Sequence, residues 1–347
     1  MITGAKQLAI SIAVAVLVMV GFNAGVSRLA RNSTPRQLLR ELDQSHHPDM
    51  LALGHSQIAA DFDARAFDQS CCDSTSKSFN AGLGATSSVE HLLILRRALQ
   101  RSPHPRFVIY GFFDFGLTEA EPCTVSDLFG NRAMSFYLEP AFAMRYYSMP
   151  LLDRVAFAIY RWIPMLVDRS TIWGHVELLR RRMQEVGLPA ATTNRFGRVQ
   201  DFDLLEPASE QAFATRGEQL ISESAPLSAP VLEMIREAKR QGACFVFVEM
   251  PMHPEHQRRF YSLPQWRRYR EYVRGLLKRE GATYVQASDW IKDPAEFADH
   301  LHLNETGAVD FSRRLGLFLR SHDKQCTSAG CAPDAAGRRV AATGTND

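Results

Sequence analysis

The stretch MLALGHS (50–56) is a short apolar run that ends in a glycine, a histidine and a serine. Such a run is typical of a buried β-strand followed by a turn. Helical spacing begins directly after it, in SQIAADFDARAFD (56–68). We therefore expect a strand that ends at Gly54 and a helix that begins near Ser56.

The same alternation of strand and helix continues on both sides of a long interruption. Further strands are predicted in KSFNAGLGA (77–85), PRFVIYGFFDFG (105–116), CFVFVEMP (244–251) and TYVQAS (283–288). Amphipathic helices are predicted at 87–100, 229–243, 264–282 and 304–322. Strands that alternate with helices indicate a parallel sheet covered on both faces. The predicted fold of residues 49–322 is thus α/β, a doubly wound, flavodoxin-like parallel sheet in three layers.

The interruption covers residues 117 to about 225, which we interpret as a helical insertion. It contains AFAMRYYSMPLLDRVAFAIYRWIPML (141–166), an aromatic-rich stretch with helical spacing, and no strand is expected in it. Aromatic residues at helical spacing suit a helical cap packed on the main domain, and they also suit substrate capture or contact with a membrane surface. Residues 323–347 are small and polar and are predicted to be disordered.

The first 30 residues are predicted to form a membrane anchor. LAISIAVAVLVMVGFNAGV (8–26) carries no charge, and at about 1.5 Å per residue a helix of this length spans roughly 30 Å of hydrocarbon. A cleavable signal peptide is the alternative, but NAG (23–25) is a poor cleavage site. We expect a transmembrane helix that stays attached, followed by a juxtamembrane linker at 31–48.

Charge bears on partners and on orientation. The chain has 40 Lys and Arg against 38 Asp and Glu, a near balance that gives no reason to expect a nucleic-acid partner. Arg28, Arg31 and Arg36 follow the apolar segment, which favours a cytoplasmic domain under the positive-inside rule. Large domains translocate despite flanking charge, so we expect a single-pass inner-membrane protein with a periplasmic domain, against the preference of these arginines.

The six cysteines leave the redox compartment open. Cys244 lies in a predicted buried strand and is interpreted as a small hydrophobic residue. The pattern allows two disulfides, or a metal-binding pair in the tail, without requiring either: Cys71 or Cys72 with Cys123, and Cys326 with Cys331.

Polar groups and glycines follow the predicted strands at the edge where ligands bind in such folds. Ser56 stands at a helix start, where its N–H can bind negative charge, although a serine there is also a common N-cap. Gly82 and Gly84 follow the second strand and allow a reacting oxygen close to the backbone. The stretch FADHLHLNETG (297–307), after the last strand, carries Asp299 and His302.

Together these residues predict a catalytic triad. A serine nucleophile needs a general base, and that base needs a carboxylate to orient it. We assign Ser56 as nucleophile, His302 as base and Asp299 as orienting carboxylate, with an oxyanion hole formed by the N–H groups of Ser56 and of Gly84 or Gly82.

Two further interpretations concern neighbouring side chains. His55, Asp114 and His253 stand at strand ends and are predicted substrate contacts. A metal site at Asp299, His300 and His302 is the alternative to the triad, but neighbouring positions in one loop make a poor tetrahedral set. No metal and no cofactor are expected.

The blocks GHS (54–56), NAGLGA (80–85) and DHLHLN (299–304) resemble, in order and placement, those of the SGNH (GDSL-type) hydrolases and acyltransferases. The resemblance covers roughly residues 50–116 and 229–322. The chain departs from the family pattern at Phe113, where the family has an asparagine that donates to the oxyanion.

With the anchor and EMPMHPEH (249–256), the sequence is similar to a membrane-anchored subgroup that resembles alginate O-acetyltransferase-like proteins. The resemblance implies a serine-dependent O-acyltransferase or esterase that acts on an extracytoplasmic polysaccharide or glycan, with a multi-span membrane acyltransferase as partner. The alternative is a catalytically inactive, membrane-anchored binding or scaffold partner of a polysaccharide-modification complex. Phe113 favours this alternative, and the intact triad residues argue against it.

Overall fold

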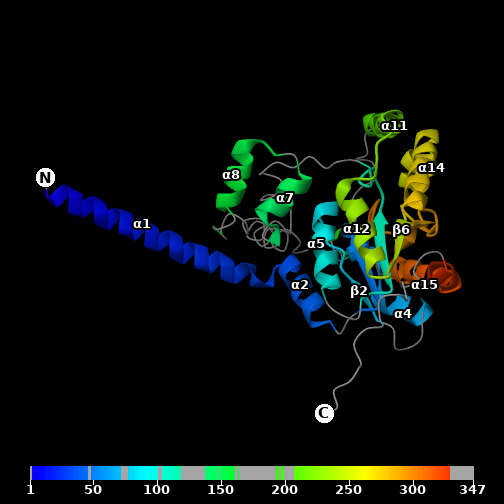
Figure 1. The fold of residues 1–347 in the computed structure, drawn as a ribbon, viewed down its shortest axis with the longest axis horizontal. Coiled ribbons are helices and arrows are strands. Elements are labelled where there is room, and N and C mark those ends of the chain that lie inside the picture. The colour runs from blue at the N-terminus through cyan, green and yellow to red at the C-terminus, as the bar shows by residue number, and fades with distance from the viewer. Residues whose placement is uncertain are drawn as a thin grey trace, which may run out of the picture.

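Five strands form a parallel sheet at the centre of the domain (Figure 1). Its order is β2-β1-β3-β6-β7, with β1 at Met50–Gly54, β2 at Ser78–Asn80, β3 at Phe107–Phe112, β6 at Cys244–Glu249 and β7 at Thr283–Gln286. The computed structural model describes residues 2–45, 48–71, 77–100, 104–118, 137–147, 149–160, 163, 193–194, 197–198 and 207–328.

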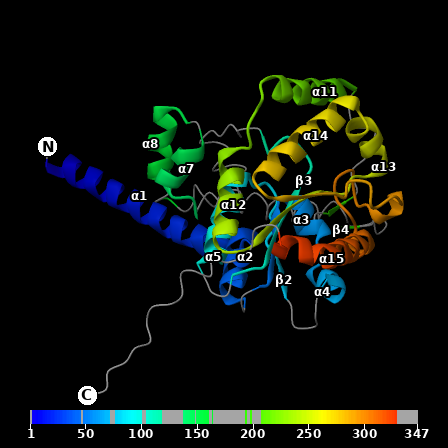
Figure 2. The same ribbon diagram turned by 45° about the vertical axis from the view of Figure 1, so that its right-hand side comes forward.

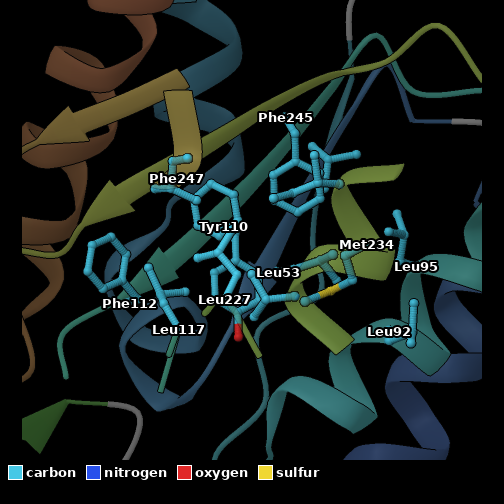
Figure 3. Packing of buried hydrophobic residues seen from close by; sticks show 14 of the residues in the cluster. Leu53, Leu92, Leu95, Tyr110, Phe112, Leu117, Leu227, Met234, Phe245 and Phe247 are labelled. Carbon is cyan, nitrogen blue, oxygen red and sulfur yellow. The ribbon is translucent and has the colours of Figure 1, made fainter. Parts of the chain in front are cut away.

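Alternate residues along each strand face opposite layers of helices. Leu51 and Leu53 of β1 enter one hydrophobic cluster, whereas Met50 and Ala52 enter another. The first cluster, shown in part in Figure 3, packs against α2 (Thr34–Gln44), α5 (Ser88–Leu99), α12 (Ala229–Arg240) and α14 (Pro264–Arg279). The second packs against α3 (Ser56–Asp61), α4 (Ala64–Cys71) and α15 (Glu305–Ser328). The predicted three-layer α/β fold with a parallel sheet is confirmed.

The strand order places a topological switch between β1 and β3. From β1 the chain crosses outward to β2 and then returns to the other side of β1 as β3. The connections that leave β1 and β3 therefore run to opposite faces of the sheet. Open α/β sheets bind ligands in the crevice that this reversal opens at the carboxyl ends of the strands. Ser56 lies at this edge, separated from the end of β1 only by His55.

The segment between β3 and β6 contains α7 (Pro140–Tyr146), α8 (Leu151–Tyr160) and α11 (Pro207–Ser222). It also contains a short antiparallel ribbon of β4 (Thr193–Asn194) and β5 (Gly197–Arg198). The expectation of no strand in this segment is wrong at this point, because a two-residue strand has no alternating pattern that a sequence can show. Phe213 of α11 packs against Phe115 and Trp266, which fixes α11 over α14.

The amino-terminal helix α1 spans Ile2–Leu29. Its segment Lys6–Leu29, in which an 18-residue window has a mean hydropathy of 2.3, is long and apolar enough to cross a membrane, a property that signal sequences near an amino terminus share. A short 3-10 turn, Ala30–Asn32, joins α1 to α2. Figures 1 and 2 show α1 projecting away from the sheet domain.

The cysteines and the carboxyl terminus are described in part. The Cys71 sulfur lies 4.0 Å from that of Met50 in the core, and Cys244 begins β6 and packs partly buried against the same cluster. The other predicted disulfide partners Cys72, Cys123 and Cys331 lie outside the described residues. Helix α15 continues past residue 322 to Ser328, and residues 329–347 of the predicted tail lie outside the described residues.

Candidate active site

Three glycines at the sheet edge allow α3 to begin close to the strand ends. A Cβ atom on Gly82 would lie 2.3 Å from the backbone nitrogen of Ala59. A Cβ on Gly54 or on Gly111 would lie 2.7 or 2.4 Å from Cγ1 of Ile58. Gly54 also has a φ of 153°. Contacts this short would displace the first turn of α3, so the glycines set the position of the residue that begins it.

The predicted histidine loop forms a tight turn before α15. An antiparallel bridge joins Phe297 to Leu303, and the Ala298 N–H donates to the His302 carbonyl at 2.8 Å. Asn304 then caps α15, since its Oδ1 accepts from the backbone N–H groups of Thr306 and Gly307 at 3.1 Å each. The turn is therefore closed by backbone hydrogen bonds on one side and by a helix cap on the other.

This turn brings together the three residues of the predicted triad. His302 Nε2 lies 2.8 Å from Ser56 Oγ, and His302 Nδ1 lies 2.8 Å from Asp299 Oδ2. Asp299 Oδ1 also accepts from the backbone N–H groups of Leu301 and His302, each at 2.8 Å. Because a carboxylate only accepts, Nδ1 carries the proton and Nε2 is left to accept from the serine hydroxyl.

Asp299 is held in its charged form. Burial acts to raise the pKa of this carboxyl. The hydrogen bond from His302, the charge of that ring and the two backbone N–H donors outweigh burial and lower the pKa below its ordinary value. An ionised carboxylate fixes the tautomer that a general base requires.

Two buried side chains that the sequence did not single out hold this turn against α3. Asp61 is fully buried, and its Oδ1 accepts from the Leu303 N–H at 2.9 Å. Gln57 donates from Nε2 to the Leu301 carbonyl at 2.9 Å. Both residues lie on the helix that Ser56 begins, so they tie the turn that carries His302 to the element that carries the serine. Their polarity within a short helix was the only sequence signal.

One of the predicted oxyanion donors is already used. The Gly82 N–H donates to Asn80 Oδ1 at 2.9 Å, which corrects its assignment, because this amide is not available to a reacting oxygen in this structure. The N–H of Ser56 lies in the first turn of α3, where helices leave amides without an acceptor. No hydrogen bond from the Ser56 or the Gly84 N–H is found among the described residues. Ala85, next to Gly84, has a φ of 57°.

Phe113 and His55 lie together beside this edge. Their ring centroids are 5.9 Å apart in an edge-to-face arrangement, and His55 makes a second such contact, at 4.9 Å, with the buried His91. The Phe113 carbonyl accepts from the Tyr261 hydroxyl. The half-buried Phe113 side chain thus contributes shape but no hydrogen-bond donor.

The other predicted substrate contacts make local hydrogen bonds. Asp114 Oδ1 accepts from the Gly116 N–H at 2.9 Å and closes the turn after β3. His253 Nδ1 accepts from the Glu255 N–H at 3.2 Å, which caps α13 (Pro254–His256). These bonds give both side chains a role in shaping the backbone next to the strand ends.

The remaining histidine of the loop lies apart from the triad contacts. The ring of His300 faces that of His256, with centroids 5.1 Å apart. Burial first, and then the charge of His300, lower the pKa of His256 to about 3. Within the described part of the chain, no group of three or more His, Cys, Asp or Glu side chains is arranged to hold a metal ion.

Comparisons with known proteins do not identify a function for this site. No protein-family model and no curated protein matches the chain. A solved structure described as "a putative platelet activating factor from Streptococcus pneumonia" is similar with a TM-score of 0.36 and 11% identity. That alignment covers 88% of this chain and 99% of the other. A similarity at this level carries no argument about activity, so what stands is an α/β protein with adjoining serine, histidine and aspartate side chains.

Proposed function

We propose that this protein is a serine-dependent acyl-ester enzyme with Ser56, His302 and Asp299 as its catalytic triad. The observation that supports the proposal is the continuous hydrogen-bonded chain from Ser56 Oγ through both ring nitrogens of His302 to Asp299. A serine that only capped its helix would need neither the imidazole nor the carboxylate behind it.

The proposed reaction has two balanced halves. Ser56 Oγ attacks the acyl carbonyl while His302 Nε2 takes the hydroxyl proton, and the carbonyl oxygen becomes an oxyanion held by the N–H groups of Ser56 and Gly84. Collapse of this intermediate breaks the ester bond, and the leaving alcohol takes the proton from His302. In the second half, an acceptor hydroxyl gives its proton to His302 and attacks the acyl-serine, and the bond to Ser56 Oγ then breaks as that oxygen takes the proton back from His302.

The proposed substrate is an O-acylated polysaccharide or glycan outside the cytoplasm. The resemblance to SGNH hydrolases and acyltransferases, and to their membrane-anchored subgroup, supports this class, as does the candidate membrane span in α1. The second half of the reaction uses water in an esterase and a sugar hydroxyl in a transferase. A multi-span membrane acyltransferase is the proposed acyl source for the transferase.

A catalytically inactive scaffold is the second candidate, and Phe113 is the observation that favours it. An apolar side chain beside the oxyanion position removes a donor that is typically worth 10²–10³-fold in rate. The scaffold would keep the glycan-binding surface and lose turnover.

Active-site labelling separates the two candidates. The full chain, purified in detergent, is treated with a fluorophosphonate and assayed for turnover of an aryl acetate. We expect labelling and turnover in the wild type, loss of both in Ser56→Ala, and retention of both in the surface control Ser262→Ala. Equal behaviour of wild type and Ser56→Ala would refute the nucleophile and favour the scaffold.

Two further measurements address the acceptor and the compartment. Acetate release from an acetylated donor is compared with and without an unacetylated glycan. Transfer to the glycan supports a transferase, and unchanged release of free acetate supports an esterase. A reporter at the carboxyl terminus that is active only outside the cytoplasm tests the proposed periplasmic location, and an inactive reporter would overturn it.

A further inference from the structure

Exposed apolar side chains are concentrated in one part of the described domain. Among the described residues outside α1, all the large hydrophobic side chains exposed to solvent lie on α7 and α8, except Leu317. They are Met144, Leu151, Leu152, Val155 and Ile159. Soluble proteins rarely expose contiguous apolar surface of this kind unless it meets a partner or a membrane.

Helix α8 is apolar on two opposite sides. Phe157 is fully buried in a small cluster with Ala143 and Tyr147. Leu152, Val155 and Ile159 follow at helical spacing and are 82%, 51% and 54% exposed. A helix that is apolar on its inner and its outer side is typical of one buried in protein or in lipid.

The α7–α8 pair is fixed to helix α5. The hydroxyls of Ser87, at the start of α5, and Tyr147, after α7, are hydrogen-bonded. The Arg96 guanidinium of α5 lies 5.2 Å from the ring centroid of Phe142 in α7. Arg145 pairs with Glu233 of α12 at 2.5 Å. The outward face of α8 therefore has a defined position on the domain.

The end of α1 is fixed to the same helix. Arg97 of α5 pairs with Asp43 of α2 through Nε and Nη2, at 2.8 and 2.5 Å, and the leucines of α2 are buried in the core. Only Ala30–Asn32 and Ser33 separate α1 from α2. The end of the candidate membrane span is thus joined through α2 to the same helix that holds α7 and α8.

The two views of the molecule agree with this placement. In Figures 1 and 2, α7 and α8 lie on the side of the domain from which α1 projects. Val26 in the last turn of α1 and Ala30 directly after the helix are buried, so the end of α1 packs against the rest of the chain. A bilayer around α1 would therefore approach the domain on its α8 side.

We propose that the outward face of α8, formed by Leu151, Leu152, Val155 and Ile159, lies in the interface of the bilayer that α1 crosses. The exposed Arg154 on the same helix suits phospholipid headgroups, as basic residues do beside the apolar face of interfacial helices. The proposal rests on α1 being a membrane span and not on catalysis. With α1, it attaches the domain to the membrane at two points.

Photocrosslinking in lipid tests the proposal. p-Benzoylphenylalanine replaces Val155 in the full chain, which is reconstituted into vesicles of phosphatidylcholine and phosphatidylglycerol. After irradiation, phospholipid adducts of the protein are detected by mass spectrometry. Matched chains carry the probe at Val16 in α1, as the lipid-exposed control, and at Gln219 on α11, as the water-exposed control. We expect phospholipid adducts at positions 155 and 16 and at most one-tenth of that yield at position 219.

The outcomes are separable. Adducts at position 16 with none above the position-219 level at position 155 would overturn the α8 proposal and leave the anchor intact. A crosslinked dimer from position 155 would also overturn it and assign the face to a second copy. The absence of adducts at position 16 would remove the membrane span on which the proposal rests. Turnover of aryl acetate by the same vesicles reports the proposed enzyme activity independently.

Discussion

Two regions near Ser56 differ in the hydrogen bonds that hold them and in the polarity of the side chain that each presents. The turn from Phe297 to Asn304 is held by a backbone bridge, a helix cap and the buried Asp61, and it presents His302 at 2.8 Å from Ser56 Oγ. The end of β3 presents Phe113, whose ring contacts that of His55 and whose backbone carbonyl accepts from the Tyr261 hydroxyl.

The difference separates the two tasks of acyl transfer. In the proposed reaction the turn would move a proton, and Ser56, His302 and Asp299 are hydrogen-bonded in series along that path. In the proposed reaction the backbone N–H groups of Ser56 and Gly84 would hold the developing negative charge, and Phe113 at the β3 end adds no side-chain donor to them. We infer that the proposed enzyme relies on proton transfer more than on oxyanion stabilisation, which the following predictions test.

The largest effect is expected from Asp299→Asn. The amide keeps the size of the carboxylate but can donate to Nδ1, so it favours the His302 tautomer that cannot accept from Ser56. We expect kcat for aryl acetate hydrolysis to fall by about 10³- to 10⁴-fold. His300→Gln, which changes a neighbouring side chain outside the triad, serves as the matched control and should stay close to wild type. A loss of less than tenfold in Asp299→Asn would show that the turn does not orient the base.

The support beneath the turn is tested at Asp61. Burial first, and then the charge of Asp299, raise the pKa of this carboxyl well above 3.8, while the Leu303 N–H acts to lower it. The protonated form is therefore favoured in the fold. The stability that the fold gains from holding Asp61 protonated is fully present below pH 3.8. It is lost as the pH rises from there through the raised pKa.

Asp61→Asn keeps an acceptor for the Leu303 N–H and has no proton to lose. We expect its Tm to exceed that of the wild type at pH 7 and the difference to shrink towards pH 4. Asp61→Ala leaves the Leu303 N–H without its acceptor and should lower the free energy of unfolding by about 1–3 kcal/mol. Thermal unfolding of the variants and the wild type between pH 4 and pH 7 tests this prediction. A Tm difference between Asp61→Asn and wild type that does not change with pH would contradict the raised pKa.

Much of the fold was predictable because its strands are short apolar runs bounded by turns and helices. All five parallel strands lie where the pattern placed them. For the central strands β1, β3 and β6, burial on both faces leaves an unbroken apolar signal, as in CFVFVEMP. The order of the strand ends also brought Ser56 next to the later His302, since parallel strands deliver their carboxyl ends to one edge.

The details that depend on tertiary contacts could not be predicted. Asn80 takes the Gly82 N–H while its own amide donates to the Ile58 and Phe62 carbonyls, and nothing in NAGLG distinguishes that glycine from Gly84. Asp61 looked like any polar residue of a short helix until its surroundings were known. The sequence of the aromatic insertion suits a cap packed on the domain and also a surface for substrate or membrane contact, because inward and outward apolar faces have the same helical spacing.

A smaller effect is expected from giving the β3 end a donor. In Phe113→Asn the side chain can donate an N–H beside the proposed oxyanion position. We expect kcat to rise by about tenfold, less than the 10²–10³-fold that an optimised donor supplies. Phe113→Leu removes the ring without adding a donor and should give no gain. A higher kcat in both variants would show that removal of the ring, and not a new hydrogen bond, causes the gain. An unchanged kcat in both would show that the missing side-chain donor does not limit the rate.

The smallest effect is expected at His256, which tests whether the neighbouring histidines share the proton-transfer task. His256 is almost fully buried, and with a pKa lowered to about 3 it stays uncharged over the range in which an ordinary histidine titrates. His256→Gln should therefore leave the midpoint of the pH profile of kcat/KM in place. The rate should change by less than about twofold, against the 10²–10⁴-fold that a general acid or base contributes. A displaced midpoint would show that His256 titrates with the site, and the proton path would then extend from His302 through His300 towards α13.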